Sequence, residues 1–294
     1  MNPAAPDSFI ERFKGLLEPS ALMWWAATHY YRVCSEAVFQ KGQVLAPIFQ
    51  TSKLRDEAFG RFWIEFSRPR EEAAEPVGSS ALIPPLLKTS KGVVLDIGPG
   101  TGTQMPLLKG SAITTIYGAE PCTGLHSELR RKAASEGLGS KYHVLPCGVA
   151  AEELLPALGT DSPSALAAYD VDPAAGVFDT ILCVRVLCSV PAMEKTTREL
   201  YSLLKPGGRL LVVEHVVNPW RTAKGSFAAR VAQAVYMFLG WRFYIGDCCL
   251  DRDTEGALRQ AAAVDGGWES VELERHFEWS AMPYISGVLT KKSL

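Results

Sequence analysis

The sequence lacks a charge excess of either sign, because 30 lysines and arginines are matched by 32 aspartates and glutamates in 294 residues. A nucleic-acid-binding domain carries a basic patch, so this balance predicts no nucleic-acid partner. The chain contains no run of 18 apolar residues, and we expect no membrane-spanning helix. Residues 1–7 show neither the basic nor the apolar segment of a secretory signal peptide. These absences favour a cytoplasmic protein, with peripheral contact to an internal membrane left open.

The cysteines lack the spacing of a metal site or of a redox motif. There are seven, an odd number, with no C-x-x-C pair, and Cys248 and Cys249 are adjacent. Scattered cysteines of this kind are typical of reduced thiols inside a cell. The sequence therefore predicts no bound metal.

The most informative segment is a short apolar run that ends in a glycine-rich loop. Residues 93–95 are typical of a buried parallel strand, and Asp96, Gly98, Gly100 and Gly102 follow in a D-x-G-x-G-x-G pattern. Glycine permits positive φ and lets a ligand lie against the backbone. A strand that ends in such a loop binds an adenosine-containing ligand at the carboxyl edge of a sheet. The spacing differs from the G-x-G-x-x-G of dinucleotide-binding folds.

Further apolar runs follow in an order that supports this prediction. Residues 114–119 form a second run and lead to Glu120, which comes 24 residues after Asp96. An acid at the end of a second strand accepts hydrogen bonds from ribose hydroxyls. Residues 178–184 indicate a fourth strand, and residues 203–214 a helix end, a Pro-Gly-Gly turn and a fifth strand.

Together, the D-x-G-x-G-x-G loop, Glu120 and the Pro-Gly-Gly turn resemble the class I S-adenosylmethionine (SAM) methyltransferases. The resemblance implies an α/β fold of Rossmann-like type, with a mostly parallel seven-stranded sheet and helices on both faces. An N-terminal helical lid is expected to precede it. SAM is the implied cofactor, and a small molecule is the implied substrate.

Five shorter motifs resemble one branch of that family, the animal microsomal alkyl-thiol methyltransferases and their fungal relatives. The similarity covers roughly residues 54–292 and departs from the branch at Arg185, where a neutral residue is expected, and at Pro99, where Cys is common. The many aromatics near the N-terminus would suit a bulky apolar acceptor, which suggests a role in fungal secondary metabolism. The motifs lie at Cys183–Val190, Leu204–Gly208, Glu214–Val216, Gly246–Cys248 and Tyr284–Gly287.

The pattern divides the chain into a helical lid or cap over 1–80 and a SAM-binding domain over 81–294. An aromatic insert at 219–250 belongs to the second domain. Helical spacing of apolar residues within 21–40 and 54–66 predicts helices, with a break near Pro19. These helices act as a lid, pack on the sheet edge, or touch a membrane surface, and the sequence leaves the three alternatives open.

Two segments of the second domain have distinct patterns. Residues 156–177 are rich in Pro, Ala, Ser, Gly and Asp, and most of this segment is predicted to be a surface loop. The tail over 268–292 alternates apolar and polar residues, so it should supply a closing antiparallel pair of strands at one sheet edge. A homodimer is compatible with the pattern but not required by it.

Each chemical group of SAM needs a different partner, and we assign candidates accordingly. Backbone N–H groups of the loop favour the carboxylate, and an acid after the second strand should hold the ribose. The segment after the third strand should meet the adenine, and the end of the fourth strand the methionine portion or the transferred methyl group. The predicted cofactor-binding residues are Asp96, Gly98, Pro99, Gly100, Thr101, Gly102, Glu120, Pro121, Ala151, Glu152, Cys183, Val184 and Arg185.

A general base is needed if the acceptor is an alcohol or a carbon acid, and matters less for a thiol. His215 is the first candidate, because it follows Glu214 at the end of the fifth strand and imidazole titrates near neutrality. Asp247 and His276 are the other predicted catalytic residues. The alternative function is a cyclase or pericyclase on the same fold, in which bound SAM is not consumed. A non-catalytic binding subunit is a third possibility.

Overall fold

The computed structural model describes residues 9–68 and 75–293, and the chain divides into two compact units. The first, here called the helical unit, comprises residues 9–68, 216–252 and 277–283. The second, here called the sheet unit, comprises residues 75–215, 253–276 and 284–293. The whole segment 219–250 therefore belongs to the same unit as the N-terminal helices. Whether these helices act as a lid stays a prediction.

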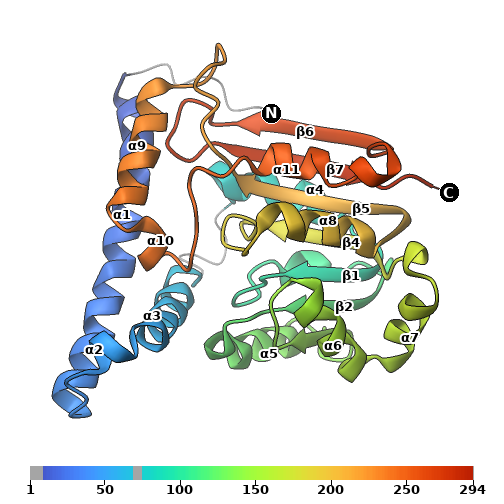
Figure 1. Cartoon of the computed structure of the whole chain (residues 1–294), viewed down its shortest axis with the longest axis horizontal. Coiled ribbons are helices and arrows are strands. Elements are labelled where there is room, and N and C mark those ends of the chain that lie inside the picture. Colours follow the sequence, from blue (N-terminus) through green and yellow to red (C-terminus); the bar gives the residue numbers. More distant parts are fainter. Residues whose placement is uncertain (1–8, 69–74, 294) are drawn as a thin grey trace. The chain divides into compact units, whose positions relative to one another are not determined.

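The sheet unit contains one seven-stranded sheet with the strand order β3-β2-β1-β4-β5-β7-β6 (Figure 1). Strands β1 to β5 run parallel to one another, and β7 pairs antiparallel with both β5 and β6. The predicted mostly parallel sheet is confirmed, as is the closing antiparallel pair. The strands are β1 (Gly92–Ile97), β2 (Ile113–Ala119), β3 (Tyr142–Leu145), β4 (Phe178–Val184), β5 (Leu204–His215), β6 (Ser270–His276) and β7 (Tyr284–Thr290).

The register of the central strands determines where a ligand can lie. Ile97 at the end of β1 pairs with Ala119 on β2 and with Cys183 on β4. The residues that follow these three strands therefore share one edge of the sheet, which is the edge where open α/β sheets bind ligands. The apolar residues of the first run, Val94 and Leu95, are fully buried, as expected for a strand covered on both faces.

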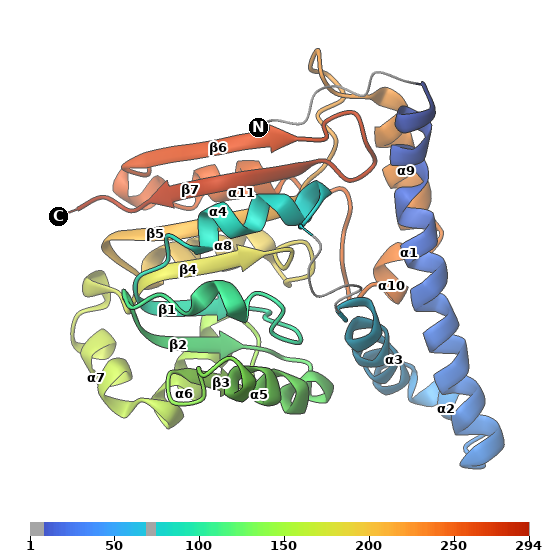
Figure 2. The ribbon, with the colours of Figure 1, turned by 180° about the vertical axis from the view of Figure 1, so that it is seen from behind.

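Helices cover both faces of this sheet. Helices α8 and α11 lie over one face in Figure 1, and α4 lies over the opposite face in Figure 2. The α-helices of the sheet unit are α4 (Ile83–Leu87), α5 (His126–Ser135), α6 (Ala151–Asp161), α7 (Pro163–Val171), α8 (Met193–Leu203) and α11 (Thr254–Gln260). Short 3₁₀ turns occur at η2 (Gly78–Leu82), η3 (Met105–Leu108), η4 (Thr123–Leu125), η5 (Pro173–Ala175) and η6 (Ala263–Asp265).

The predicted surface loop over 156–177 is wrong, because most of it is helical in α6 and α7. Leu154 and Leu158 are one helical turn apart and both fully buried, so packing stabilises α6 although Pro156 lies inside it. Pro163 occupies the first turn of α7, where its missing N–H has no intrahelical partner to lose. A composition rich in proline therefore concealed two helices.

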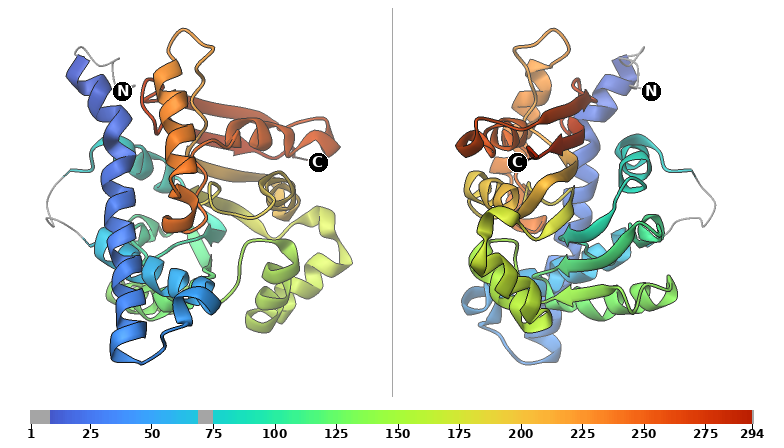
Figure 3. Two further views of the ribbon diagram at one scale, coloured as in Figure 1. Left: turned by 60° about the vertical axis from the view of Figure 1, so that its left-hand side comes forward. Right: turned by 90° about the vertical axis from the view of Figure 1, so that its right-hand side faces the viewer.

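The helical unit is built around a long first helix. Figure 3 shows α9 beside α1, and α3 and α10 also contact α1. Among the described residues, none of the helices combines the length and the apolar character that crossing a bilayer requires. The elements are α1 (Phe9–Ser35), the π-helical turn η1 (Glu36–Gln40), α2 (Ala46–Phe49), α3 (Thr51–Phe66), α9 (Phe227–Phe238) and α10 (Trp241–Tyr244).

The predicted break at Pro19 is also wrong, because α1 runs through it. Proline cannot donate to the carbonyl four residues earlier, which here belongs to Gly15. That carbonyl accepts the backbone N–H of Ala281 instead, at 3.1 Å. A partner distant in sequence thus replaces the hydrogen bond that Pro19 cannot make, and local sequence could not reveal it.

One buried amide joins the remote segments of the helical unit. The Gln233 side chain on α9 is fully buried, and its Nε2 lies 3.1, 2.9 and 3.2 Å from the carbonyl oxygens of Val216, Leu250 and Ala281. Its Oε1 accepts the backbone N–H of Asn218 at 2.9 Å. A single side chain therefore satisfies backbone groups of three separate segments.

We predict that Gln233→Leu lowers the free energy of unfolding by about 3 kcal/mol, because each buried backbone group left without a partner costs about 1–3 kcal/mol. Urea denaturation of the full chain measures this change. Gln40→Leu, at an exposed position of the same unit, is the control and should change stability by less than about 0.5 kcal/mol. Equal effects of the two substitutions would contradict the role given to Gln233.

Candidate functional site

The glycine loop after β1 has the backbone conformation that its sequence predicts. Gly98, Gly100 and Gly102 have φ angles of 58°, 62° and 79°, in the region that favours glycine. At Gly98 a Cβ atom would lie 2.5 Å from Cγ2 of Val186, so no larger residue fits there without a shift. The loop can therefore approach a ligand closely with its backbone.

Glu120 follows β2 and lies against this loop. Its Oε2 accepts the backbone N–H of Gly100 at 2.9 Å, and its Oε1 accepts that of Cys122 at 2.9 Å. Burial raises the pKa of Glu120, and the two backbone hydrogen bonds oppose the rise. Each carboxylate oxygen has a second lone pair. The side chain can thus brace the loop and still accept a ribose hydroxyl, the role that the sequence predicts for it.

Asp96, at the end of β1, is buried and holds an aromatic partner that the sequence did not reveal. Its Oδ2 accepts the hydroxyl of Tyr142, a β3 residue, at 2.8 Å. Strand β2 lies between β1 and β3, and Tyr142 crosses it at Gly118, where a Cβ atom would lie 2.5 Å from the tyrosine oxygen. Burial raises the pKa of Asp96 to about 7, although the Tyr142 hydrogen bond lowers it.

The residues predicted to meet the adenine lie at the start of α6. The backbone N–H of Ala151 donates to Oε2 of Glu199 at 3.0 Å. Glu152 is exposed and forms a salt bridge with Lys195 on α8, with 2.6 Å between the carboxylate oxygen and Nζ. Both contacts tie α6 to α8. An adenine contact by either residue stays a prediction, as does the role of exposed Pro121.

The end of β4 supplies three predicted residues with different environments. Cys183 is fully buried, and burial raises the pKa of its thiol well above the usual value, so it stays protonated. Val184 is half-buried. Arg185 has a φ of 56°, unusual for a residue with a side chain, and its backbone N–H still donates to Val213 of β5 at 2.8 Å. Its guanidinium contacts Ser79 and Ser80, as described below.

Glu214 and His215 end β5 and are both buried. Oε1 of Glu214 accepts the backbone N–H groups of Val186 and Leu187 at 2.8 and 3.0 Å, while its buried Oε2 accepts no hydrogen bond from any described residue. Burial raises the pKa of Glu214 to about 7. Burial alone would lower the pKa of His215, but a hydrogen bond with the thiol of Cys188 and the nearby Glu214 raise it.

The other two predicted catalytic residues are placed differently. His276 ends β6, and its Nε2 lies 2.7 Å from Oγ of Ser286. Tyr284 on β7 pairs with His215 on β5 and with His276 on β6, so strand β7 lies between the two histidines. Asp247 belongs to the helical unit, where salt bridges of 2.6 and 3.6 Å link it to Arg55 and Arg242. The catalytic roles of all three stay predictions.

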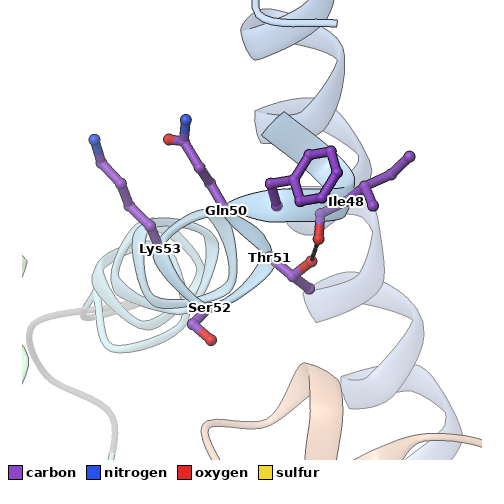
Figure 4. A pocket seen from close by; sticks show the side chains of 6 residues that line it. Ile48, Gln50, Thr51, Ser52 and Lys53 are labelled. Carbon is purple, nitrogen blue, oxygen red and sulfur yellow. Dashed lines mark hydrogen bonds between the residues drawn. The ribbon is translucent and has the colours of Figure 1, made fainter. Parts of the chain in front are cut away.

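An open depression at the junction of α2 and α3 is shown in Figure 4. Thr51 is one of its lining residues, and its hydroxyl donates to the carbonyl oxygens of Pro47 and Ile48 at 2.7 and 3.1 Å. Lys53 is the one charged residue among those that line it. This surface therefore offers no acid–base pair. The lining residues are Ile48, Phe49, Gln50, Thr51, Ser52 and Lys53.

Comparison with known proteins agrees with this geometry. A family model described as a methyltransferase domain matches residues 69–262. Human thiol S-methyltransferase TMT1B is 34% identical over 121 residues, which are 40% of this chain and 45% of that protein. Human thiol S-methyltransferase TMT1A is 32% identical over 116 residues, 40% of this chain and 45% of that protein. The match thus spans less than half the length of these curated relatives.

Solved structures are similar at low sequence identity. The [4+2]-cyclase SpnF has a TM-score of 0.49 at 16% identity, covering 76% of this chain and 86% of that one. An O-methyltransferase family protein from Burkholderia thailandensis has a TM-score of 0.48 at 13% identity, covering 95% and 72%.

The buried carboxyl group of Asp96 predicts a pH dependence of stability. Its pKa is about 7 in the folded chain against an ordinary 3.8, so the folded chain holds the proton more tightly than the unfolded chain does. The free energy of unfolding should therefore fall as the pH rises from about 4 to about 7. Asp96→Asn should make this slope shallower by up to about 1.4 kcal/mol per pH unit.

Urea denaturation at several pH values between 4.5 and 7 measures the slope. Asp170→Asn, at an exposed position of the same unit, is the matched control and should keep the wild-type slope. If Asp96→Asn also kept it, the carboxyl group would not titrate as its burial implies.

Proposed function

The chain belongs to the methyltransferase-domain family, and from this we propose that it transfers the methyl group of SAM to an apolar small molecule. The observation that carries the proposal is the pair of hydrogen bonds between the Glu120 carboxylate and the N–H groups of Gly100 and Cys122. They hold a glycine loop with positive φ angles at the carboxyl edge of β1 and β2. SAM as the predicted cofactor agrees with the family.

The residues present fit this cofactor. The three glycines from Gly98 to Gly102 have no side chains, so a ligand can contact the backbone of the loop directly. The carboxylate oxygens of Glu120 still have lone pairs that can accept hydrogen bonds from ribose hydroxyls. Asp96 lies at the end of the same strand. When bound, SAM supplies an electrophilic methyl group, whose bond to sulfur breaks as its bond to the acceptor forms, and the electron pair stays on that sulfur.

The acceptor must lose a proton, and His215 is the residue proposed to take it. It lies at the carboxyl end of β5, beside a buried thiol and a buried carboxyl group. Neutral imidazole can accept a proton near physiological pH. We propose a thiol as the acceptor, supported by the names of the two human relatives. A fungal secondary metabolite as the acceptor rests on the sequence resemblance alone.

Turnover assays with SAM and a panel of alkyl thiols, aryl thiols and phenols test the proposal. We expect a product heavier than the acceptor by one methylene group, formed in equal amount with S-adenosylhomocysteine. An isomer of the acceptor, formed only with SAM present and without S-adenosylhomocysteine, would instead establish the cyclase alternative. A folded chain that converts none of these compounds would contradict the proposed activity.

His215→Asn should lower kcat for an alkyl thiol by about 100-fold or more, because a positioned base contributes roughly 10²–10⁴-fold. The loss should be smaller for an aryl thiol, which is already ionised near neutral pH. In the wild type, kcat should fall as the pH drops below the raised pKa of His215, because the protonated imidazole cannot accept a proton.

The pH profile of His215→Asn should lack this fall. His143→Asn, on β3 in a partly exposed salt bridge with Asp161, serves as the matched control and should keep the wild-type profile. An unchanged profile in His215→Asn would show that another group accepts the proton.

A further inference from the structure

Arg185 carries a positive charge that no carboxylate in the described part of the chain balances by a salt bridge. Its Nη2 donates to the hydroxyl oxygens of Ser79 and Ser80 at 2.8 and 3.0 Å, and its Cζ lies 5.8 Å from the ring centre of Tyr284. All of these partners are neutral. Its buried Nε has no hydrogen-bond partner among the described residues. Buried or half-buried arginines are usually paired, so an unpaired one indicates a missing anion.

Glu214, the buried acid on the neighbouring strand β5, does not fill this role. Oε1 of Glu214 is held by the backbone N–H groups of Val186 and Leu187. Arg185 acts on Glu214 only through the electrostatic field, where it lowers the pKa that burial has raised. Arg185 also lowers the pKa of His215, although Cys188 and Glu214 raise that pKa above its ordinary value. Neither residue at the end of β5 therefore forms a salt bridge with Arg185.

The two serines make the surroundings of Arg185 still richer in hydrogen-bond donors. Each hydroxyl oxygen accepts from the guanidinium, so its own proton remains to be donated. Ser79 and Ser80 belong to η2, directly before α4. Both Nη2 hydrogens are used on the serines, so Nη1 and the two hydroxyl protons are the donors that a carboxylate's two oxygens could accept.

The position of this group points to the acceptor rather than to the cofactor. The glycine loop and Glu120 lie at the ends of β1 and β2, on one side of β4. Arg185 extends from the end of β4 to Tyr284 on β7, which lies beyond β5 on the other side. The backbone of Arg185 is in the left-handed region, an uncommon conformation for a residue with a side chain.

We propose that Arg185 binds a carboxylate on the methyl acceptor, so that the acceptor is an apolar thiol with an anionic group distant from its sulfur. The inference rests on the proposed function and names its substrate class. Arg185 then determines specificity, and the cofactor contact that the sequence suggested for it is the competing interpretation. A carboxylate-bearing acceptor gains charge-assisted hydrogen bonds that an uncharged analogue cannot form.

The experiment compares 4-mercaptobenzoate with benzenethiol, which differ by one carboxylate. For the wild type we expect kcat/KM to be about 10- to 100-fold higher for 4-mercaptobenzoate, and Arg185→Met to abolish most of this ratio. Arg185→Lys should restore part of it, because lysine keeps the charge but not the guanidinium's hydrogen bonds with the two serines and its remaining donors. Arg131→Met, at an exposed position of α5, is the control and should keep the wild-type ratio.

Two results would overturn the proposal. One is a wild-type ratio near 1, and the other is an Arg185→Met variant that raises KM for SAM while keeping the ratio, which would assign Arg185 to the cofactor. Calorimetric titration of 4-mercaptobenzoate, with and without S-adenosylhomocysteine, needs no turnover. Loss of this binding in Arg185→Met would support the carboxylate site even if methyl transfer itself were refuted, and equal binding in both proteins would refute the site.

Discussion

The rest of the site depends on the two hydrogen bonds that the Glu120 carboxylate accepts, one from the loop after β1 and one from the segment after β2. Gly100 and Cys122 each contribute one backbone N–H, so a single side chain joins the residues that follow two neighbouring parallel strands. Because the ends of β1, β2 and β4 are in register, fixing this loop also fixes the edge that Cys183 and Arg185 share. The positions of the other candidate residues follow from this edge.

Three buried carboxyl groups lie at the ends of strands in the sheet unit, on Asp96, Glu120 and Glu214. Burial raises the pKa of each, to about 7 for Asp96 and Glu214. Such groups reduce the stability of the folded chain at neutral pH, and proteins retain costly groups of this kind mainly at functional sites. The free Oε2 of Glu214 and the unpaired charge of Arg185 belong to the same pattern.

Local sequence was sufficient for the sheet and insufficient for the contacts across it. Apolar runs and turn residues identified β1, β2, β4 and β5, because strand formation there depends on neighbouring residues. The contact between Tyr142 and Asp96 depends on the register of three strands and on the missing side chain of Gly118, so no local pattern could reveal it. The helix through Pro19 likewise depends on a distant N–H, that of Ala281.

The candidate site was predictable where a motif fixes backbone geometry and less so where a side chain acts alone. The glycine loop and Glu120 lie together as their spacing indicates. Asp247 was grouped with His215 by residue type, yet it lies in the helical unit in salt bridges with Arg55 and Arg242. Cys188 lies in a motif that the sequence singled out, but its hydrogen bond with His215 could not be predicted, because it joins residues near the ends of different strands.

Calorimetric titration of SAM into the full chain and into Glu120→Gln, with Glu128→Gln on α5 as the control, measures how far SAM binding depends on the Glu120 carboxylate. We expect one SAM per wild-type chain, equal affinity in the control, and about 10- to 100-fold weaker binding in Glu120→Gln, because a charge-assisted acceptor is lost. A folded wild-type chain that binds no SAM, or a Glu120→Gln variant that binds it as tightly as the wild type, would show that the Glu120 carboxylate does not hold the cofactor.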